Sequence, residues 1–115
     1  MFIKPNETVL FQGDSVTDMD RNADPNGVGV GYVYSTISLF HALHPDMNVT
    51  FINRGISGNR VKDLQARWQE DALDLNPDVL SILIGINDTW RRFDANDPTS
   101  TQAYEDSYRD ILTQA

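Results

Sequence analysis

The sequence predicts an α/β fold built on a parallel sheet with helices on both faces. Short apolar runs alternate with stretches that repeat apolar residues at helical spacing, giving the order β-α-β-α-β-α. The runs are apolar on both faces, as strands are when helices cover the two sides of a sheet. Each run is followed by a polar segment that contains glycine. These observations favour right-handed crossovers between neighbouring parallel strands.

The first strand is predicted over residues 8–12, where Thr-Val-Leu-Phe-Gln is followed at once by Gly13. A helix is expected over residues 30–43, with Val33, Ile37 and Phe40 on one face. The sequence His44-Pro45 ends it.

The second strand is predicted over residues 49–52, which are mostly β-branched or aromatic. A single helix is expected over residues 61–75, closed by Asn76-Pro77. Its apolar stripe consists of Val61, Leu64, Trp68, Ala72 and Leu75.

The third strand is predicted over residues 79–84, the most apolar run in the chain, which Gly85 ends. Thr99 and Gln102 fit a capping box with Thr99 as the N-cap of a last helix. The apolar face of that helix carries Tyr104, Tyr108, Ile111 and Leu112.

The length and composition limit the classes of function. The 115 residues correspond to one domain, expected over residues 1–115, with 9 Lys and Arg against 17 Asp and Glu. The resulting net charge of −8 argues against nucleic acid or an anionic membrane as the partner. Without cysteine, the chain has neither disulfides nor thiolate catalysis. No signal-peptide-like stretch is visible, so a cytoplasmic location is the default expectation.

Three polar segments follow the three strands, at residues 13–18, 53–60 and 85–90. The carboxyl ends of parallel strands share one edge of the sheet, which is where open α/β sheets bind ligands. In that setting Ser15 can present a hydroxyl above the sheet, Gly58 an unobstructed N–H, and Asn87 an amide N–H. A serine with convergent donors is the set of groups that acyl transfer requires.

At these residues the chain resembles the SGNH hydrolases, also called GDSL lipases or esterases. The resemblance rests on three blocks in register: Phe11-Gln12-Gly13-Asp14-Ser15-Val16-Thr17-Asp18, Asn53-Arg54-Gly55-Ile56-Ser57-Gly58-Asn59, and Ile84-Gly85-Ile86-Asn87-Asp88. It implies a flavodoxin-like three-layer α/β/α fold with sheet order 2-1-3-4-5, of which strands 4 and 5 would be missing here.

The resemblance also implies roles for individual residues. Ser15 would be the nucleophile, and the N–H groups of Ser15 and Gly58 with the Asn87 side chain would form the oxyanion hole. Other residues of the blocks would support the site, with the aspartates orienting the loops: Gly13, Asp14, Asp18, Asn59, Gly85 and Asp88. No cofactor or metal is implied.

The resemblance further implies a catalytic Asp-x-x-His motif, and the chain departs from the family here. Its two histidines, His41 and His44, have no aspartate three residues before them. We therefore expect an N-terminal part of a larger esterase for short acyl groups, such as acetyl on carbohydrate. Without the base, its activity is expected to be weak or absent. Trp90 and Arg91 are candidates for the substrate rim.

Two alternatives to an esterase remain open at this stage. One is a non-catalytic α/β module that binds or dimerises. The other is a phospho-acceptor domain that uses Asp14 or Asp88 with a divalent metal. In all of these interpretations, the esterase included, the outer edge of the third strand would be apolar and unpaired, which predicts a homodimer through that edge or pairing with a missing C-terminal segment.

Overall fold

The sheet of the computed structural model, which describes residues 2–115, has three parallel strands. They are β1 (Thr8–Gly13), β2 (Thr50–Asn53) and β3 (Val79–Leu83), in the order β2-β1-β3. Leu10 of β1 is paired with Ile52 on one side and Leu80 on the other. The strand order, the parallel direction and the flanking helices agree with the predicted fold class.

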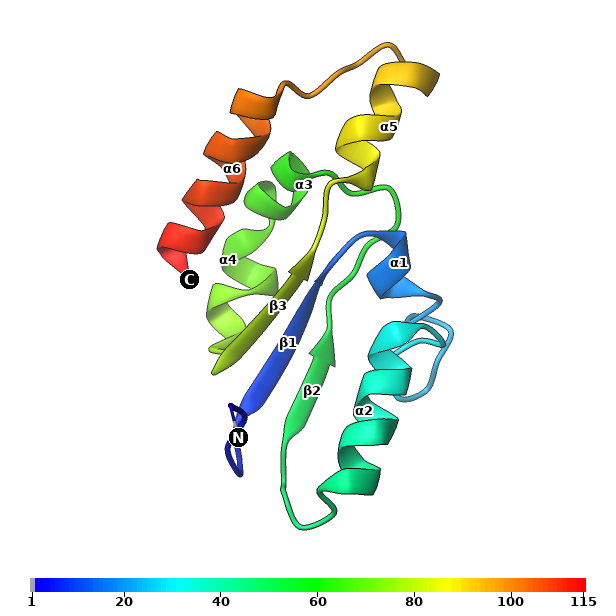
Figure 1. Cartoon of the computed structure of the whole chain (residues 1–115), viewed down its shortest axis with the longest axis vertical. Helices are drawn as coiled ribbons and strands as arrows, with labels where there is room; N and C mark the ends of the chain where they lie inside the picture. Colours follow the sequence, from blue (N-terminus) through cyan, green and yellow to red (C-terminus); the bar gives the residue numbers. More distant parts are fainter. Residues whose placement is uncertain (1) are drawn as a thin grey trace.

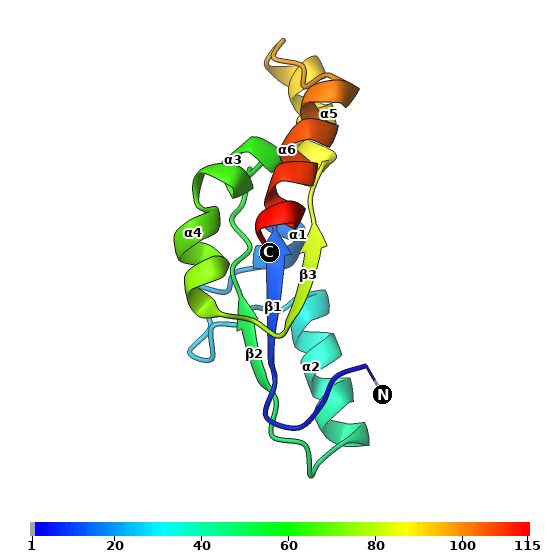
Figure 2. The ribbon, with the colours of Figure 1, turned by 90° about the vertical axis from the view of Figure 1, so that its left-hand side faces the viewer.

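Helices cover the two faces of the sheet unequally. Helix α2 (Tyr32–Leu43) lies on one face, and α3 (Val61–Ala66), α4 (Trp68–Asp71) and α6 (Thr101–Gln114) lie on the other (Figure 1 and Figure 2). The short helix α1 (Ser15–Asp18) and α5 (Ile86–Asp94) lie at the end of the sheet toward which the strands point (Figure 1). The fold therefore has three layers, with helices on both faces of a sheet whose central strand is β1.

The two faces of β1 belong to two separate hydrophobic cores. Leu10 is fully buried with Leu64, Trp68 and Ile111, beneath α3, α4 and α6. On the opposite face, Val9 and Phe11 pack with Val33 of α2 and with neighbouring aromatic rings. The even burial of β1 on both faces explains why its sequence is apolar without alternation.

The helix expected over residues 61–75 is interrupted. The α-helical hydrogen bonding breaks at Arg67, whose φ and ψ are −109° and 11°, and a 3-10 turn, η1 (Leu73–Leu75), replaces the last α-helical turn. The predicted stripe still faces the core, because Val61, Leu64, Trp68 and Ala72 are buried. The periodicity was correct for the buried face and wrong for the continuity of the backbone.

The N-cap of the last helix is Ser100 and not Thr99. The Ser100 hydroxyl accepts a hydrogen bond from the Ala103 N–H at 3.1 Å, and the helix begins at Thr101. Two hydroxyl residues stand side by side here, and either can cap a helix. The capping-box pattern of Thr99 with Gln102 is not used, because the Gln102 amide donates to Asp106.

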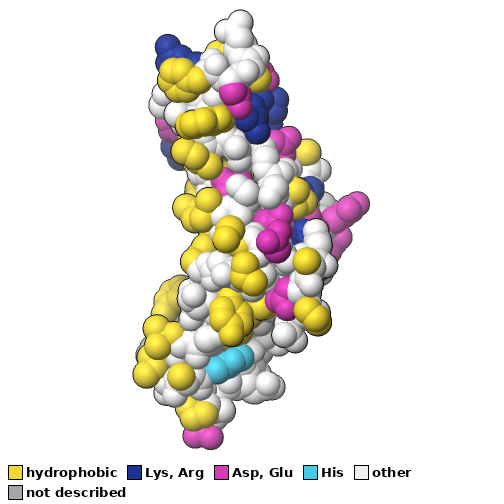
Figure 3. Space-filling view, turned by 90° about the vertical axis from the view of Figure 1, so that its right-hand side faces the viewer, with side chains coloured by type: hydrophobic (Ala, Val, Ile, Leu, Met, Phe, Trp, Pro, Cys, Tyr) yellow, Lys and Arg dark blue, Asp and Glu magenta, His cyan; other side chains and the backbone are white. Residues whose placement is uncertain are grey.

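Strand β3 is an edge strand, since within residues 2–115 β1 is the one strand that pairs with it. Its residues are only partly buried, and Leu83 is 49 % exposed. Hydrophobic side chains also gather along one margin of the surface in Figure 3. Within residues 2–115, no helix combines the length and the hydropathy needed to span a membrane.

Candidate active site

The first polar segment is a tight turn that lifts Ser15 out of the end of β1. Asp14 is buried and caps α1, with its Oδ1 accepting a hydrogen bond from the Val16 N–H at 3.0 Å. Ser15 is the first residue of α1 and is exposed. A side chain at Gly13 would overlap the Thr17 side chain and the Leu83 carbonyl, so β1 can approach β3 and α1 only with glycine there.

The second polar segment follows β2 and packs against the first. The buried Asn53 amide donates to the carbonyls of Thr17, at 2.6 Å, and Val28, at 3.0 Å. Its Oδ1 accepts the Gly55 N–H at 2.9 Å, which turns the chain toward α1. Gly58 then adopts a left-handed φ of 84°, with no atom within 4 Å of the position of a Cβ. Gly58 therefore places no side chain beside its own N–H.

The third segment, expected to be a loop, forms the first turns of α5. Gly85 precedes the helix with a φ of 135°, and Asn87 is the second helical residue. Asn87 Nδ2 donates to the Asn59 carbonyl at 3.1 Å. An amide nitrogen carries two hydrogens, so one N–H of Asn87 remains for a ligand.

Hydrogen bonds hold the three segments together at one edge of the sheet, as the parallel topology predicts. The Ile56 N–H donates to the Gly13 carbonyl at 3.1 Å, which joins the second segment to the first. The bond from Asn87 to Asn59 joins the third segment to the second. Residues separated by more than seventy positions are thereby brought into one site.

At this edge, the backbone N–H groups of Ser15 and Gly58 are among those that have no partner in the hydrogen bonds of residues 2–115. The Ser15 hydroxyl is also without a hydrogen-bond partner in this part of the chain. A free hydroxyl beside free donors can bind the carbonyl group of an ester, because its oxygen accepts hydrogen bonds while its carbon is open to attack.

The remaining aspartates of the motifs brace the loops. Asp18 Oδ2 accepts hydrogen bonds from the Ser57 hydroxyl, at 3.1 Å, and from the Ser57 N–H, at 3.3 Å. Asp88 is 4 % exposed, and its Oδ2 accepts the Val61 N–H at 3.0 Å. Burial raises the pKa of the Asp88 carboxyl above its ordinary value, an effect that the bond from Val61 partly opposes.

Arg67 is a residue of this region that the sequence reasoning missed. Its guanidinium donates to the Asn59 side chain at 2.8 Å, to the Arg54 carbonyl at 2.9 Å and to the Gly13 carbonyl at 3.3 Å. It also pairs with Asp71 at 2.9 Å. The sequence shows only that Arg67 is a basic residue on the helix expected after the second motif. A charged side chain at such a position is usually solvated, so nothing marked Arg67 as part of the site.

Both histidines lie away from Ser15. His41 packs its ring against Phe51, near the amino end of β2, at 5.6 Å between centroids. His44 is the C-cap of α2 and packs on Phe40. The histidine atoms in Figure 3 lie over the lower part of α2, while α1 lies at the opposite end of that helix (Figure 1). Neither imidazole is in a position to serve as base for Ser15.

The candidate rim residues follow Asn87 by three and four positions on α5, so they share its side of the helix. Trp90 is 57 % exposed. The Arg91 guanidinium is held by Asp94 at 2.5 Å, so its charge is partly balanced.

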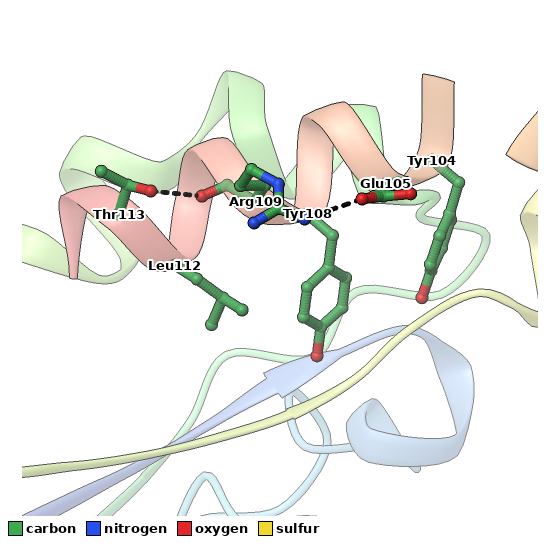
Figure 4. Close-up of a pocket in the computed structure, with 6 residues that line it drawn as sticks. All are labelled: Tyr104, Glu105, Tyr108, Arg109, Leu112 and Thr113. Carbon is green, nitrogen blue, oxygen red and sulfur yellow. Dashed lines mark hydrogen bonds and ion pairs between the residues drawn. The ribbon is translucent and has the colours of Figure 1, made fainter. Parts of the chain in front are cut away.

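A cavity of about 420 Å³ lies apart from these residues, on α6. Tyr104, Tyr108 and Leu112 project from the helix toward β3 and form its apolar wall (Figure 4). It does not contain Ser15. No group of three or more His, Asp or Glu side chains suited to a metal ion occurs in residues 2–115.

Comparison with known proteins agrees with the motifs. The profile of the GDSL-like Lipase/Acylhydrolase family matches residues 11–115. An acetylxylan esterase from Geobacillus stearothermophilus is 43 % identical over 118 residues, which cover 97 % of this chain and 53 % of that protein. The chain thus spans about half the length of this curated relative.

Solved structures show the same relationship. The acetylxylan esterase Axe2 from Geobacillus stearothermophilus superposes with a TM-score of 0.93 at 40 % identity, covering 99 % of this chain and 56 % of that one. Its solved catalytic mutants replace a serine, an aspartate and a histidine with alanine. LAE5, an alpha/beta hydrolase enzyme from the metagenome of Lake Arreo, Spain, superposes with a TM-score of 0.92 at 33 % identity, covering 99 % and 57 % of the two chains. The chain therefore belongs to the GDSL-like lipase/acylhydrolase family.

Proposed function

We propose that the chain carries the acyl-binding half of a serine esterase that removes acetyl groups from carbohydrate. The observation that carries the proposal is the exposed, unpartnered Ser15 hydroxyl at the edge where three motif loops are joined by hydrogen bonds. The acetyl preference is supported by the similarity to the acetylxylan esterase from Geobacillus stearothermophilus.

The proposed chemistry starts with attack of Ser15 Oγ on the ester carbonyl. The carbonyl oxygen becomes an oxyanion and accepts hydrogen bonds from the Ser15 N–H, the Gly58 N–H and the free N–H of Asn87. The bond between the acyl carbon and the sugar oxygen then breaks, and this oxygen takes up the proton that Ser15 lost, so that the sugar leaves as an alcohol. Water hydrolyses the acetyl-serine to acetate and restores the Ser15 hydroxyl.

This cycle requires a base that accepts the Ser15 proton during attack and returns it to the leaving alcohol. In residues 2–115 both imidazoles lie at the far end of α2. We propose that turnover by this chain alone is slow, because deprotonation then depends on solvent. The base would come from an Asp-x-x-His segment paired with this half of the site.

Trp90 and Arg91 are proposed as the rim against which the sugar lies. An exposed indole offers an apolar face to the C–H groups of a pyranose ring, and a guanidinium offers hydrogen bonds to its hydroxyls. Their place on α5, one turn beyond Asn87, supports this assignment.

We also propose that the free edge of β3 pairs with another strand. The candidates are a second copy of this chain, giving a two-fold dimer, and a C-terminal segment of the same protein. The open backbone groups of β3, the 49 % exposure of Leu83 and the apolar wall of Tyr104 and Tyr108 support pairing. Sedimentation of the chain at micromolar concentration tests the dimer, and a monomer across the whole concentration range would contradict it.

Ester hydrolysis tests the enzymatic part of the proposal. The wild-type chain and Ser15→Ala are incubated with p-nitrophenyl acetate, p-nitrophenyl octanoate and acetylated xylo-oligosaccharides. We expect slow release from the acetyl substrates that depends on Ser15, with less release from the octanoate. Equal rates for the wild type and Ser15→Ala, in folded samples, would favour the alternative of a non-catalytic binding module.

A further inference from the structure

Arg67 connects the segments of the site in a way that its location on the sequence does not suggest. Its four hydrogen bonds reach the end of β1, two points on the loop after β2, and α4. Three of the four acceptors therefore belong to the loops that carry the motifs. The side chain is 15 % exposed, so most of it is shielded from solvent by this part of the fold.

The bond to Asn59 continues toward the third loop. The Asn59 side chain accepts from Arg67 Nε at 2.8 Å, while the Asn59 carbonyl accepts from Asn87 Nδ2 at 3.1 Å. Asn59 also directly follows Gly58, whose N–H is one of the free donors. A displacement of Asn59 would therefore move the donors at Gly58 and Asn87 together.

The bond to Gly13 supplies the other fixed point. Gly13 lies two residues before Ser15 and also accepts the Ile56 N–H at 3.1 Å. The planar guanidinium thus links the turn before Ser15 to the loop that carries Gly58 and Asn59, and it fixes the distance between them.

The chemistry of this side chain suits the task. A guanidinium presents several N–H groups in a fixed plane, whereas the single nitrogen of lysine cannot span acceptors on three segments. Asp71 balances the charge at 2.9 Å. Burial lowers the pKa of Arg67, while the bond to Asp71 works in the opposite direction.

We propose that Arg67 is a positioning residue, which acts through Asn59 to fix the Gly58 and Asn87 donors relative to Ser15. This inference rests on the proposed function for its catalytic meaning. The hydrogen bonds by which Arg67 holds Gly13, Arg54 and Asn59, here called the clamp, can be tested without turnover. It predicts that loss of the guanidinium plane loosens these loops while leaving the hydrophobic core intact.

The first measurement is amide hydrogen exchange by NMR on the wild type, Arg67→Lys and the control Arg109→Lys. Arg109 is exposed, and its guanidinium pairs with Glu105, four residues away on the same helix. We expect Arg67→Lys to accelerate exchange at Ile56 and Asn59 at least tenfold relative to Leu10, a core amide. A role in general stability would instead accelerate all three amides equally, and an unchanged ratio would overturn the proposal.

The second measurement is the labelling of Ser15 by a small alkyl fluorophosphonate, followed by mass spectrometry. We expect Arg67→Lys to lower the maximal rate of labelling at least tenfold with little change in the concentration for half-maximal rate. Equal maximal rates in the wild type and Arg67→Lys would contradict a positioning role. Asn59→Ala, which removes only the bond to Arg67 Nε, should give a smaller decrease in the maximal rate of labelling. It replaces Arg67→Lys as the test variant if Arg67→Lys does not fold.

The two measurements separate the two hypotheses. If the wild type is not labelled but the exchange ratio changes, the proposed esterase function fails and the clamp stands. If the wild type is labelled and neither the exchange ratio nor the labelling rate responds to Arg67→Lys, the clamp fails and the esterase proposal stands.

Discussion

Gly58 and Gly27 provide a matched pair that tests whether the Gly58 N–H belongs to the site. Both adopt a left-handed φ, 84° and 70° respectively, and at both a Cβ would meet no atom within 4 Å. Alanine at either position therefore suffers only the strain of the left-handed backbone, about 1–2 kcal/mol. Alanine also lowers the conformational entropy of the unfolded chain, which stabilises the folded state by about 0.4–1 kcal/mol. The net loss of unfolding free energy should be about 1 kcal/mol in both variants.

The two variants should differ in their reactivity. In Gly58→Ala the new methyl group projects into the space beside a proposed oxyanion donor, whereas Gly27 lies in the loop before α2. Complete removal of one such donor typically lowers rates by about 10²–10³-fold. Because the N–H is obstructed and not removed, we expect about a tenfold slower phosphonylation of Ser15 in Gly58→Ala and no change in Gly27→Ala.

Urea unfolding followed by circular dichroism measures the stability of the two variants, and intact-mass spectrometry measures the labelling rate. Gly13→Ala belongs in the same series, since its methyl would overlap the Leu83 carbonyl of the neighbouring strand. Such overpacking destabilises by about 1–3 kcal/mol. Equal slowing of labelling in Gly27→Ala and Gly58→Ala would refute the assignment of the Gly58 N–H to the site. Gly13→Ala as the most stable of the three variants would refute the predicted overlap with Leu83.

Three further predictions concern the base, a buried carboxyl and a helix cap. Added imidazole should accelerate hydrolysis of p-nitrophenyl acetate more in the wild type than in Ser15→Ala, because it replaces the missing base; equal acceleration would mean that only solution catalysis occurs. Burial raises the pKa of Asp88 above 3.8, so the neutral carboxyl is favoured in the folded state. The Tm of the wild type minus that of Asp88→Asn should therefore fall as pH rises from 3 to 7 through the folded pKa, and a rising difference would refute this sign. Ser100→Ala should lower the free energy of unfolding by about 1 kcal/mol through loss of the N-cap of α6, as read from urea unfolding, and an unchanged midpoint would show that the cap is unimportant.

The sheet and the meeting of the three strand-end loops were largely predictable, because the strands carry local sequence signals and the parallel topology follows from their order. Apolar runs that are buried on both faces mark strands without alternation, as in β1. The parallel topology then places every strand-end loop at one edge, so the sequence alone groups Ser15, Gly58 and Asn87. The hydrogen bonds at Ile56 and Asn87 agree with that grouping.

Helix α5 was not predicted, for a physical reason. Its apolar residues Ile86, Trp90 and Phe93 repeat at helical spacing, but they are 56 %, 57 % and 75 % exposed and overlap the glycine and asparagine of the motif. The motif residues are typical of turns, and the stripe has no core to face within residues 2–115. Pattern alone could not distinguish a loop from a short helix here.

Arg67 was missed because nothing local distinguishes it from a solvated helical arginine. Its acceptors at Gly13, Arg54 and Asn59 are 54, 13 and 8 residues away in the sequence. Only the fold brings them together. Ser100 was missed for a smaller reason, because two adjacent hydroxyl residues are equally suited to capping.

The most direct test of the proposed site is to find which residue a small alkyl fluorophosphonate modifies, by peptide mass spectrometry of the wild-type chain. Ser57 is an internal comparison, since it is an exposed serine at the same edge whose hydroxyl is hydrogen-bonded to Asp18 at 3.1 Å. We predict a single adduct on Ser15, absent from Ser15→Ala. An adduct on Ser57, or no adduct on a chain shown to be folded by circular dichroism, would contradict the assignment of Ser15 as the nucleophile.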